Sequence, residues 1–199
     1  GQGCTAGDQG QLALRQLDYR KHNHTMTTLF TIGHSDQSLE ALIHRLTDAG
    51  VRVLVDIRSH PGSKRHPQFD EHNLRQASEQ AGLTYHWAGR QLGGMRTGQV
   101  DSCHTALERG LRDFADYMDT PPFKQAASQI TRLANQDATA LLCAEADPVR
   151  CHRSLIADFL TLQGTEVLHL LWPDGQQVHH LRAEARRESA ALVYDRSTQ

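Results

Sequence analysis

Short apolar runs alternate with segments of helical spacing along most of this chain, and this alternation constrains the fold more than any other feature. The first two runs are Leu29 to Ile32 and Val51 to Ile57, and the spacing predicts a helix over residues 39–49 between them. Ser38 is its expected N-cap, and Gly50 ends it. Strands separated by helices form mainly parallel sheets covered on both faces. The sequence therefore predicts an α/β domain of three layers, α/β/α, with a mainly parallel sheet.

The same alternation divides the rest of the chain into elements and segments. Residues 1–25 are polar without a sustained apolar period, which predicts a flexible N-terminal extension. Residues 26–172 are predicted to form a single α/β domain, and residues 173–199 a C-terminal tail or helix. The further elements predicted inside the domain are helices over 69–81, 107–118, 123–133 and from Cys151 onward, with strands over 84–87, 138–144 and 166–171.

Charge and cysteine content limit the classes of partner and compartment. The net charge is -2, from 21 basic and 23 acidic residues, so no global positive field holds nucleic acid, although local basic clusters leave a nucleic-acid partner open. No apolar run approaches the roughly 20 residues that span a bilayer, so no membrane partner is expected. Four irregularly spaced cysteines without a secretory signal argue against a disulfide framework and predict a cytoplasmic protein. No particular oligomeric state is predicted.

The stretch from Ala140 to Ser154 concentrates reactive side chains. Its apolar run ends in Cys143 and Glu145, and a helix is expected to open at Cys151, His152 and Arg153. A helix N-terminus attracts anions and stabilises a thiolate, so Cys151 is a candidate nucleophile and His152 a candidate proton carrier. Packing is an equally good account of Cys151, and it is the preferred account of Cys143, which ends an apolar strand.

Polar residues also follow the first two predicted strands. Gly33, His34 and Ser35 follow one strand and offer close backbone approach, an imidazole and a hydroxyl. Asp56 and Arg58 end the other and lie two positions apart, so they point to the same side. They either pair with each other or serve separately, Asp56 in catalysis or orientation and Arg58 in ligand contact. In a parallel sheet these ends gather where ligands bind.

Two loops add candidate anion contacts. The basic loop around Arg65 is either a cover that closes over a phosphate or carboxylate, or a solvated loop. Gly93 and Gly94 suit a turn or a nest of backbone amides. The cysteine–arginine spacing of phosphatase loops, the Walker motif and the dinucleotide glycine fingerprint are all missing from the sequence.

No cofactor is expected, and a metal site is the alternative. Cys143, Cys151 and His152, with His34 or Asp56, have the right chemistry for a metal. The spacing Cys-x7-Cys is, however, not that of a structural zinc site, so no metal ligand is assigned.

Several of these motifs occur together in an order that resembles a known family. Thr31-Ile-Gly-His-Ser, Val55-Asp-Ile-Arg-Ser-His-Pro, Leu92-Gly-Gly, Phe114-Ala-Asp-Tyr-Met and Leu142-Cys-Ala-Glu, followed by Cys151-His-Arg, are similar to domain-of-unknown-function family 488 over about residues 28–170. The resemblance implies a shared site without naming a reaction. Carried over by position, its residues are Gly33, His34, Ser35, Asp56, Arg58, Pro61, Gly93, Gly94, Cys143, Glu145, Cys151, His152 and Arg153.

These observations predict a hydrolase or transferase that binds a small anionic or phosphate-bearing ligand, such as a nucleotide or a nucleic-acid end. Two other classes stay open: a non-catalytic nucleotide or nucleic-acid binding module, and a Cys/His metal-binding protein. The candidate catalytic residues are Cys151, Glu145, His34, His152 and Asp56. The candidate ligand-binding residues are Gly33, Ser35, Arg58, Arg65, Gly93, Gly94 and Arg153.

Overall fold

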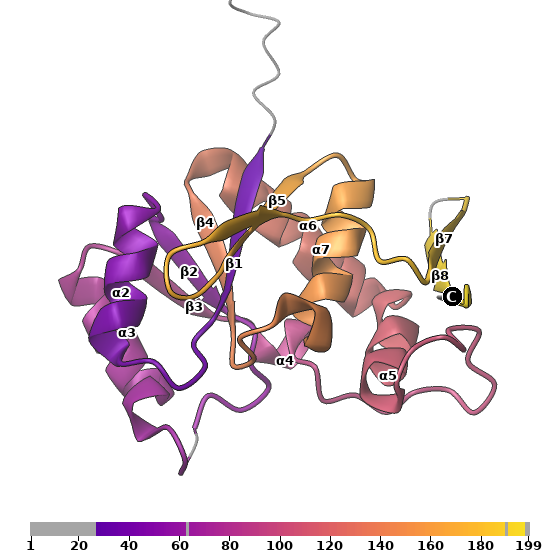
Figure 1. Ribbon diagram of the computed structural model, residues 1–199, viewed down its shortest axis with the longest axis horizontal. Coiled ribbons are helices and arrows are strands. Elements are labelled where there is room, and N and C mark those ends of the chain that lie inside the picture. The colour runs from indigo at the N-terminus through magenta and orange to yellow at the C-terminus, as the bar shows by residue number, and fades with distance from the viewer. Residues whose placement is uncertain (1–26, 63, 190, 198–199) are drawn as a thin grey trace, which may run out of the picture.

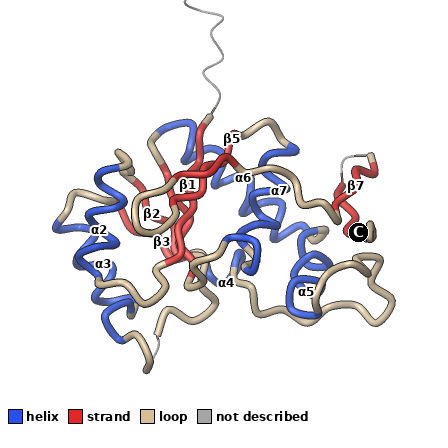
Figure 2. Tube along the Cα trace, in the orientation of Figure 1, coloured by secondary structure: helices blue, strands red, loops and turns tan. Residues whose placement is uncertain are grey.

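A six-stranded sheet forms the centre of the molecule (Figure 2). The structure is a computed structural model that describes residues 27–62, 64–189 and 191–197, so the extension predicted over residues 1–25 lies outside the described residues. Five strands are parallel, and the sixth, at one edge, is antiparallel. The order across the sheet is β3 (Thr84–Trp87), β2 (Val53–Asp56), β4 (Thr139–Cys143), β1 (Thr28–Gly33), β5 (Glu166–Leu170) and β6 (Gln176–Val178).

Helices cover both faces of this sheet, which confirms the predicted three-layer α/β fold (Figure 1). Among the described residues, no helix is both long and apolar enough to cross a membrane. One face carries α2 (Leu39–Asp48) and α3 (Glu71–Gln80), and the other carries α5 (Arg109–Met118), α6 (Pro121–Gln136) and α7 (Arg153–Leu162). Short helical turns are α4 (Gly89–Leu92), η1 (Pro67–Phe69) and η2 (Pro148–Arg150).

The two layers of core arise from the two-residue period of the strands. In β4, Leu141 and Cys143 belong to the apolar cluster of α5, α6 and α7, whereas Ala140 and Leu142 belong to the cluster of α2 and α3. Every residue of β4 is buried, as expected for a central strand of a parallel sheet. The reactive residues that follow β4 therefore begin from a fixed, fully packed element.

Local signals at the helix ends behave largely as the sequence predicts. The Ser38 hydroxyl accepts a hydrogen bond of 3.0 Å from the Ala41 amide and caps α2. Gly50 follows that helix with a φ of +75°. Helix α6, however, starts at Pro121 rather than at residue 123, because a proline in the first helical turn loses no intrahelical hydrogen bond.

The C-terminal segment differs from the tail or helix expected over residues 173–199. Its described residues form β6 and a separate hairpin of β7 (Ala185–Glu188) and β8 (Ala191–Tyr194). The helix alternative is not found in these residues, because Ala185, Leu192 and Tyr194 reach the core from strands, beside α5 and α7 (Figure 1). Arg182, between β6 and β7, donates to the Val149 carbonyl and the Ser154 hydroxyl, so this segment holds the loop before α7.

A buried chain of hydrogen bonds joins this segment to the sheet and to α7. Asp158 of α7 accepts from His179 Nε2 at 2.8 Å and from the Tyr194 hydroxyl at 3.0 Å. Because a carboxylate only accepts, His179 Nδ1 is the acceptor for His169 Nε2 at 2.8 Å. His169 Nδ1 then accepts from the Thr31 hydroxyl at 2.6 Å. Both imidazoles fit this chain in the neutral form.

Acidification is therefore expected to destabilise the protein through His169. Burial, followed by the nearby His179 and Arg153, lowers the pKa of His169 to about 3, against about 6.5 in an unfolded chain. Below pH 6.5 the unfolded state binds the extra proton, so stability present above that pH is lost progressively as the pH falls toward 3, by about 2 kcal/mol at pH 5. Urea unfolding at pH 7 and pH 5 measures this loss. A His169→Gln variant should show a shallower pH dependence, and an unchanged one would contradict the assignment.

Candidate functional site

The carboxyl ends of β1, β2 and β4 are adjacent, because these strands are neighbours in the sheet. Their register extends past the strands: the amides of His34 and Ser35 donate to the carbonyls of Cys143 and Ala144 at 3.0 and 2.9 Å. Ser35 has a φ of +52°, an unusual backbone conformation for a residue with a side chain. The structure thus brings the predicted strand-end residues into one place.

A pair of cysteine sulfurs lies at this edge. Cys143 is the last residue of β4 and Cys151 follows η2, and their Sγ atoms are 2.8 Å apart. Both thiols are free and buried. Cys151 lies just before the N-terminus of α7, and its Sγ accepts from the amide of Arg153 at 3.5 Å, as expected for a thiol at a helix N-terminus.

His152 completes this cluster, and its contacts place a proton on Nε2. Its Nε2 lies 3.0 Å from the Leu92 carbonyl oxygen, which only accepts, so Nε2 carries a proton. Its Nδ1 faces the sulfurs of Cys143 and Cys151 at 3.9 and 3.7 Å. The edge of the ring packs on Phe114, with centroids 4.9 Å apart. His152 therefore presents either a lone pair or a second proton to the two sulfurs.

The two thiols differ in acidity. A hydrogen bond from Cys151 lowers the pKa of Cys143 well below its ordinary value, although burial acts in the opposite direction. Burial, followed by its hydrogen bond to Cys143, raises the pKa of Cys151 well above the usual range. The directions of these shifts favour Cys143 as the more acidic sulfur of the pair and Cys151 as the thiol that donates to it.

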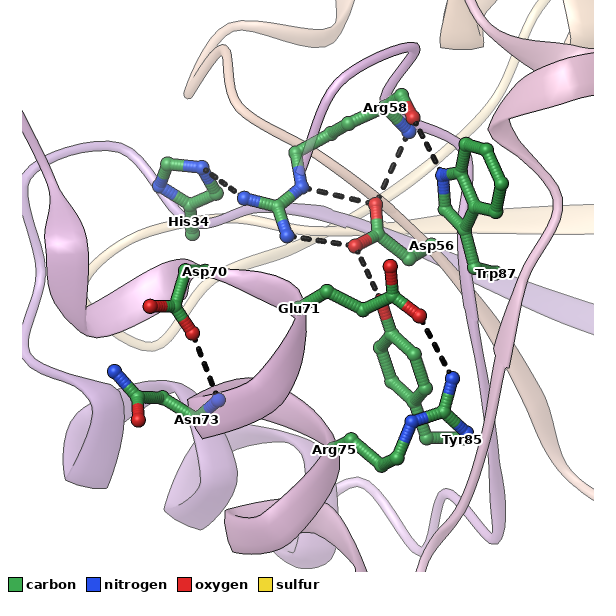
Figure 3. A network of polar contacts seen from close by, with 9 residues as sticks. All are labelled: His34, Asp56, Arg58, Asp70, Glu71, Asn73, Arg75, Tyr85 and Trp87. Atoms are coloured by element: carbon green, nitrogen blue, oxygen red, sulfur yellow. Dashed lines mark hydrogen bonds and ion pairs between the residues drawn. The ribbon is translucent and has the colours of Figure 1, made fainter. Parts of the chain in front are cut away.

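Asp56 is committed to an ion pair inside the protein (Figure 3). Its carboxylate accepts from the Nε and Nη2 atoms of Arg58 at 2.9 and 2.6 Å, and from the amide of Arg58 at 3.0 Å. Tyr85 of β3 donates its hydroxyl to the same carboxylate at 2.8 Å. Burial, followed by the Asp56 charge, raises the pKa of Tyr85, so the phenol stays protonated. Of the two alternatives for Asp56 and Arg58, the mutual pair is the one present.

His34 contacts both this ion pair and the end of β4 that carries Cys143. The Nη1 atom of Arg58 faces His34 Nε2 (Figure 3), at a distance of 3.3 Å. On the other side of the ring, His34 Nδ1 lies 2.8 Å from the Ser35 carbonyl oxygen. Nδ1 therefore donates and Nε2 accepts. The ring stacks on Phe69, with centroids 4.2 Å apart. Burial lowers the pKa of His34, although the hydrogen bond to the Ser35 carbonyl acts in the opposite direction. The net lowering of the pKa favours the neutral imidazole.

Arg153 holds the loop between the two cysteines. Its side chain is fully buried and donates to the carbonyls of Glu145 and Ala146. Gly33 lies against the same turn, because a Cβ there would meet the Glu145 carbonyl oxygen at 1.7 Å. Gly94 lies against the ring of His152. Arg153, Gly33 and Gly94 are predicted from the sequence as ligand contacts. In the structure they pack against the loop between the two cysteines and against the ring of His152.

A cleft of about 720 Å³ lies beside the sulfur pair. Its walls carry positive and negative groups, including the exposed arginines Arg65 and Arg150. Glu145 is exposed to the cleft, and its carboxylate accepts a 3.4 Å hydrogen bond from the Asp147 amide. The charged and titratable residues lining the cleft are His34, Asp36, Arg65, His66, Glu108, Glu145, Arg150, Cys143, Cys151 and His152.

Some residues of the site were outside the sequence prediction. Tyr85 was read only as part of a short strand, and its pairing opposite Leu54 in β2 carries its hydroxyl to Asp56. Trp87 donates its indole N–H to the Arg58 carbonyl at 3.0 Å. Arg150 lines the cleft and is not among the ligand contacts that the sequence predicts. The strand alternation of Tyr85 and Trp87 beside a polar strand end is the signal that could have found them.

Cys143, Cys151 and His152 also have the donor atoms of a metal site. Among the described residues they form the group whose possible ligand atoms all lie within 4.8 Å of one another. Two sulfurs and an imidazole nitrogen are ligands that zinc accepts.

Comparison with known proteins identifies the family. The family model described as "Domain of unknown function DUF488" matches residues 38–160. The match covers more than half of the chain, so this chain belongs to the DUF488 family, as the motifs predicted. No curated protein and no solved structure is similar enough to the chain to count as a match.

Proposed function

We propose that this member of the DUF488 family is a cytoplasmic hydrolase or transferase that binds a phosphate-bearing ligand in the cleft and uses Cys143 as its nucleophile. The observation that carries the proposal is the geometry of three residues at the cleft wall: the sulfurs of Cys143 and Cys151 are 2.8 Å apart, and His152 Nδ1 faces both of them. A nucleophile paired with a proton carrier is the arrangement of covalent catalysis. Free thiols at the centre of the site suit a reducing compartment.

The chemistry follows from the single proton in the sulfur pair. The Cys143 thiolate forms a bond to the electrophilic atom of the ligand, and the leaving group departs with its electron pair and takes the proton of Cys151. Nδ1 of His152 then accepts a proton from water or from an acceptor alcohol, which attacks the covalent intermediate and releases the Cys143 thiolate. The proton on Nδ1 passes to the nearby Cys151 thiolate, which restores the starting state of the pair. The sequence favoured Cys151 as nucleophile, and the acidity of the pair favours Cys143 instead.

Ligand charge is the second part of the proposal. Arg65 and Arg150 line the cleft, and Arg150 is exposed on η2 beside Cys151. Arginine is well suited to the oxygens of a phosphate. Arg58 and Arg153, the arginines favoured from the sequence, already bind Asp56 and the loop carbonyls. Because both side chains are exposed at the cleft, we assign anion contact to Arg65 and Arg150, with a nucleotide or a nucleic-acid end as the ligand class.

A thermal-shift series tests the ligand class. Inorganic phosphate, AMP, a sugar phosphate and a short 5′-phosphorylated oligonucleotide are the probes, and binding to the folded state raises the melting temperature. We expect the shift to fall in Arg65→Ala and Arg150→Ala and to persist in Arg132→Ala, an exposed arginine that lines a different cleft. A shift equally large in all three variants would remove the anion site from this cleft.

Thiol alkylation tests the nucleophile. At pH 6 we expect iodoacetamide to modify Cys143 on the order of tenfold faster than an ordinary thiol of pKa about 8.5, because Cys143 is already ionised. The fast phase should disappear in Cys143→Ser and remain in Cys103→Ser, which removes an exposed thiol. Mass spectrometry of the modified peptide measures both. Slow alkylation together with ligand binding would favour the non-catalytic binding module.

A further inference from the structure

Three donor atoms converge on one point at the wall of the cleft. The sulfurs of Cys143 and Cys151 lie 3.9 and 3.7 Å from His152 Nδ1, and 2.8 Å from each other. All three residues line the cleft, so a group bound by them has one side open to it.

The surroundings of His152 orient its ring as a ligand. Its Nε2–H donates to the Leu92 carbonyl oxygen, and Nδ1 faces the two sulfurs, where the neutral ring offers a lone pair to a metal ion. A second ring nitrogen fixed by a carbonyl is the usual arrangement around metal-binding histidines. Gly94 lies against the ring, where a Cβ would meet Nδ1 at 2.6 Å, and Phe114 packs on it. The imidazole is thereby held by packing as well as by its hydrogen bond.

We infer that Cys143, Cys151 and His152 form an exchangeable three-ligand site for Zn²⁺, which masks the thiol nucleophile when the ion is bound. The inference rests on the proposed function, because it concerns the regulation of the same sulfur pair. Zinc takes the place of the proton that the two sulfurs share: Cys151 releases that proton to solvent, and both thiolates coordinate the ion. The fourth coordination position faces the cleft.

The distances agree with this inference after a small local movement. A tetrahedral Zn²⁺ with bonds of about 2.3 Å to sulfur and about 2.0 Å to nitrogen sets its sulfurs about 3.8 Å apart and its sulfur–nitrogen distances near 3.5 Å. The sulfur–nitrogen distances in the structure are within a few tenths of an ångström of that value. The sulfurs need to separate by about 1 Å, which rotation of the two cysteine side chains can supply.

The donor set selects zinc among common divalent ions. Thiolate and imidazole ligands favour zinc over magnesium and calcium, which take oxygen ligands. A site with three protein ligands keeps an open position, in contrast to the closed four-ligand sites that serve structure. The sheet, the helices and the loop held by Arg153 have their own partners, so folding does not depend on the ion. Zinc is consequently expected to be removable by a chelator with the fold intact.

Metal titration of the full chain tests the site. Protein treated with EDTA and reductant, then freed of both, is titrated with Zn²⁺ against a chromogenic chelator. We expect one ion per chain, with affinity lower by more than about 100-fold in Cys143→Ser, Cys151→Ser and His152→Ala, because each change removes a ligand. Cys103→Ser, the control, should bind as the unchanged protein does. Absence of stoichiometric binding, or equal binding in the ligand variants, would overturn the zinc site.

Alkylation of the zinc-free and zinc-loaded protein separates this inference from the proposed function. We expect zinc to slow modification of Cys143 by at least about tenfold, since the ion withdraws negative charge from the coordinated sulfur and blocks the approach of the reagent. Rapid alkylation that zinc leaves unchanged would overturn the masking and retain the thiol nucleophile. Stoichiometric zinc with slow alkylation of the zinc-free protein would retain the metal site and remove the proposed nucleophile.

Discussion

Replacing Asp56 by asparagine is expected to lower the free energy of unfolding by about 3 to 5 kcal/mol. The change keeps the shape of the side chain but removes the charge that Arg58 faces. Asp56 is completely buried and Arg58 is 7% exposed, so the guanidinium would lose its paired carboxylate and gain little water in exchange. The carboxylate also accepts from the Tyr85 hydroxyl, and that hydrogen bond would weaken (Figure 3). Urea unfolding at pH 7 measures the loss.

A second ion pair in the same view provides the matched control. Arg75 and Glu71 of α3 are 2.8 Å apart, but their side chains are 42% and 41% exposed (Figure 3). Glu71→Gln should therefore cost less than about 0.5 kcal/mol, because water screens the pair. Combining Asp56→Asn with Arg58→Met removes both charges and should recover part of the stability. Equal losses in Asp56→Asn and Glu71→Gln would contradict the burial argument.

The layered fold could be predicted because its information is local. The period of β-branched and apolar residues marks the strands, and Ser38 and Gly50 mark the two ends of a helix, Gly50 with a φ of +75°. The C-terminal hairpin could not be predicted in this way. It has few apolar residues, and its strands are stable only because Tyr194 and Leu192 pack on distant helices.

The sequence could predict which residues gather at the candidate site, but not which of them react and which only hold the structure in place. Neighbouring parallel strands bring their carboxyl ends together, which is a consequence of fold class and could be stated beforehand. Sequence could not reveal that Arg153 is enclosed by loop carbonyls or that Cys143 lies against Cys151. Both facts depend on the path of the loop over residues 144–150. Cys143 was favoured as packing because it ends an apolar strand, yet that position is where a strand meets the cleft.

Replacing Gly33 by alanine is expected to destabilise the protein by about 3 kcal/mol, near the upper end of the usual cost of overpacking. The added Cβ would lie 1.7 Å from the Glu145 carbonyl oxygen and 2.8 Å from Arg153 Nη1. Backbone on both sides must separate, because β1 is a central strand and the Glu145 carbonyl is held by Arg153. Thermal and urea unfolding measure the stability change.

The same substitution should also disturb the sulfur pair, and this distinguishes a local role from a general loss of packing. Displacing the Glu145 carbonyl moves the loop that joins Cys143 to Cys151, so the fast alkylation of Cys143 should slow even where the protein is fully folded. Gly110→Ala is the control, since nothing lies within 4 Å of a Cβ there and alanine favours the helix that contains it. We expect no loss of stability and an unchanged alkylation rate in that variant. Fast alkylation in folded Gly33→Ala protein would show that the loop does not set the acidity of Cys143.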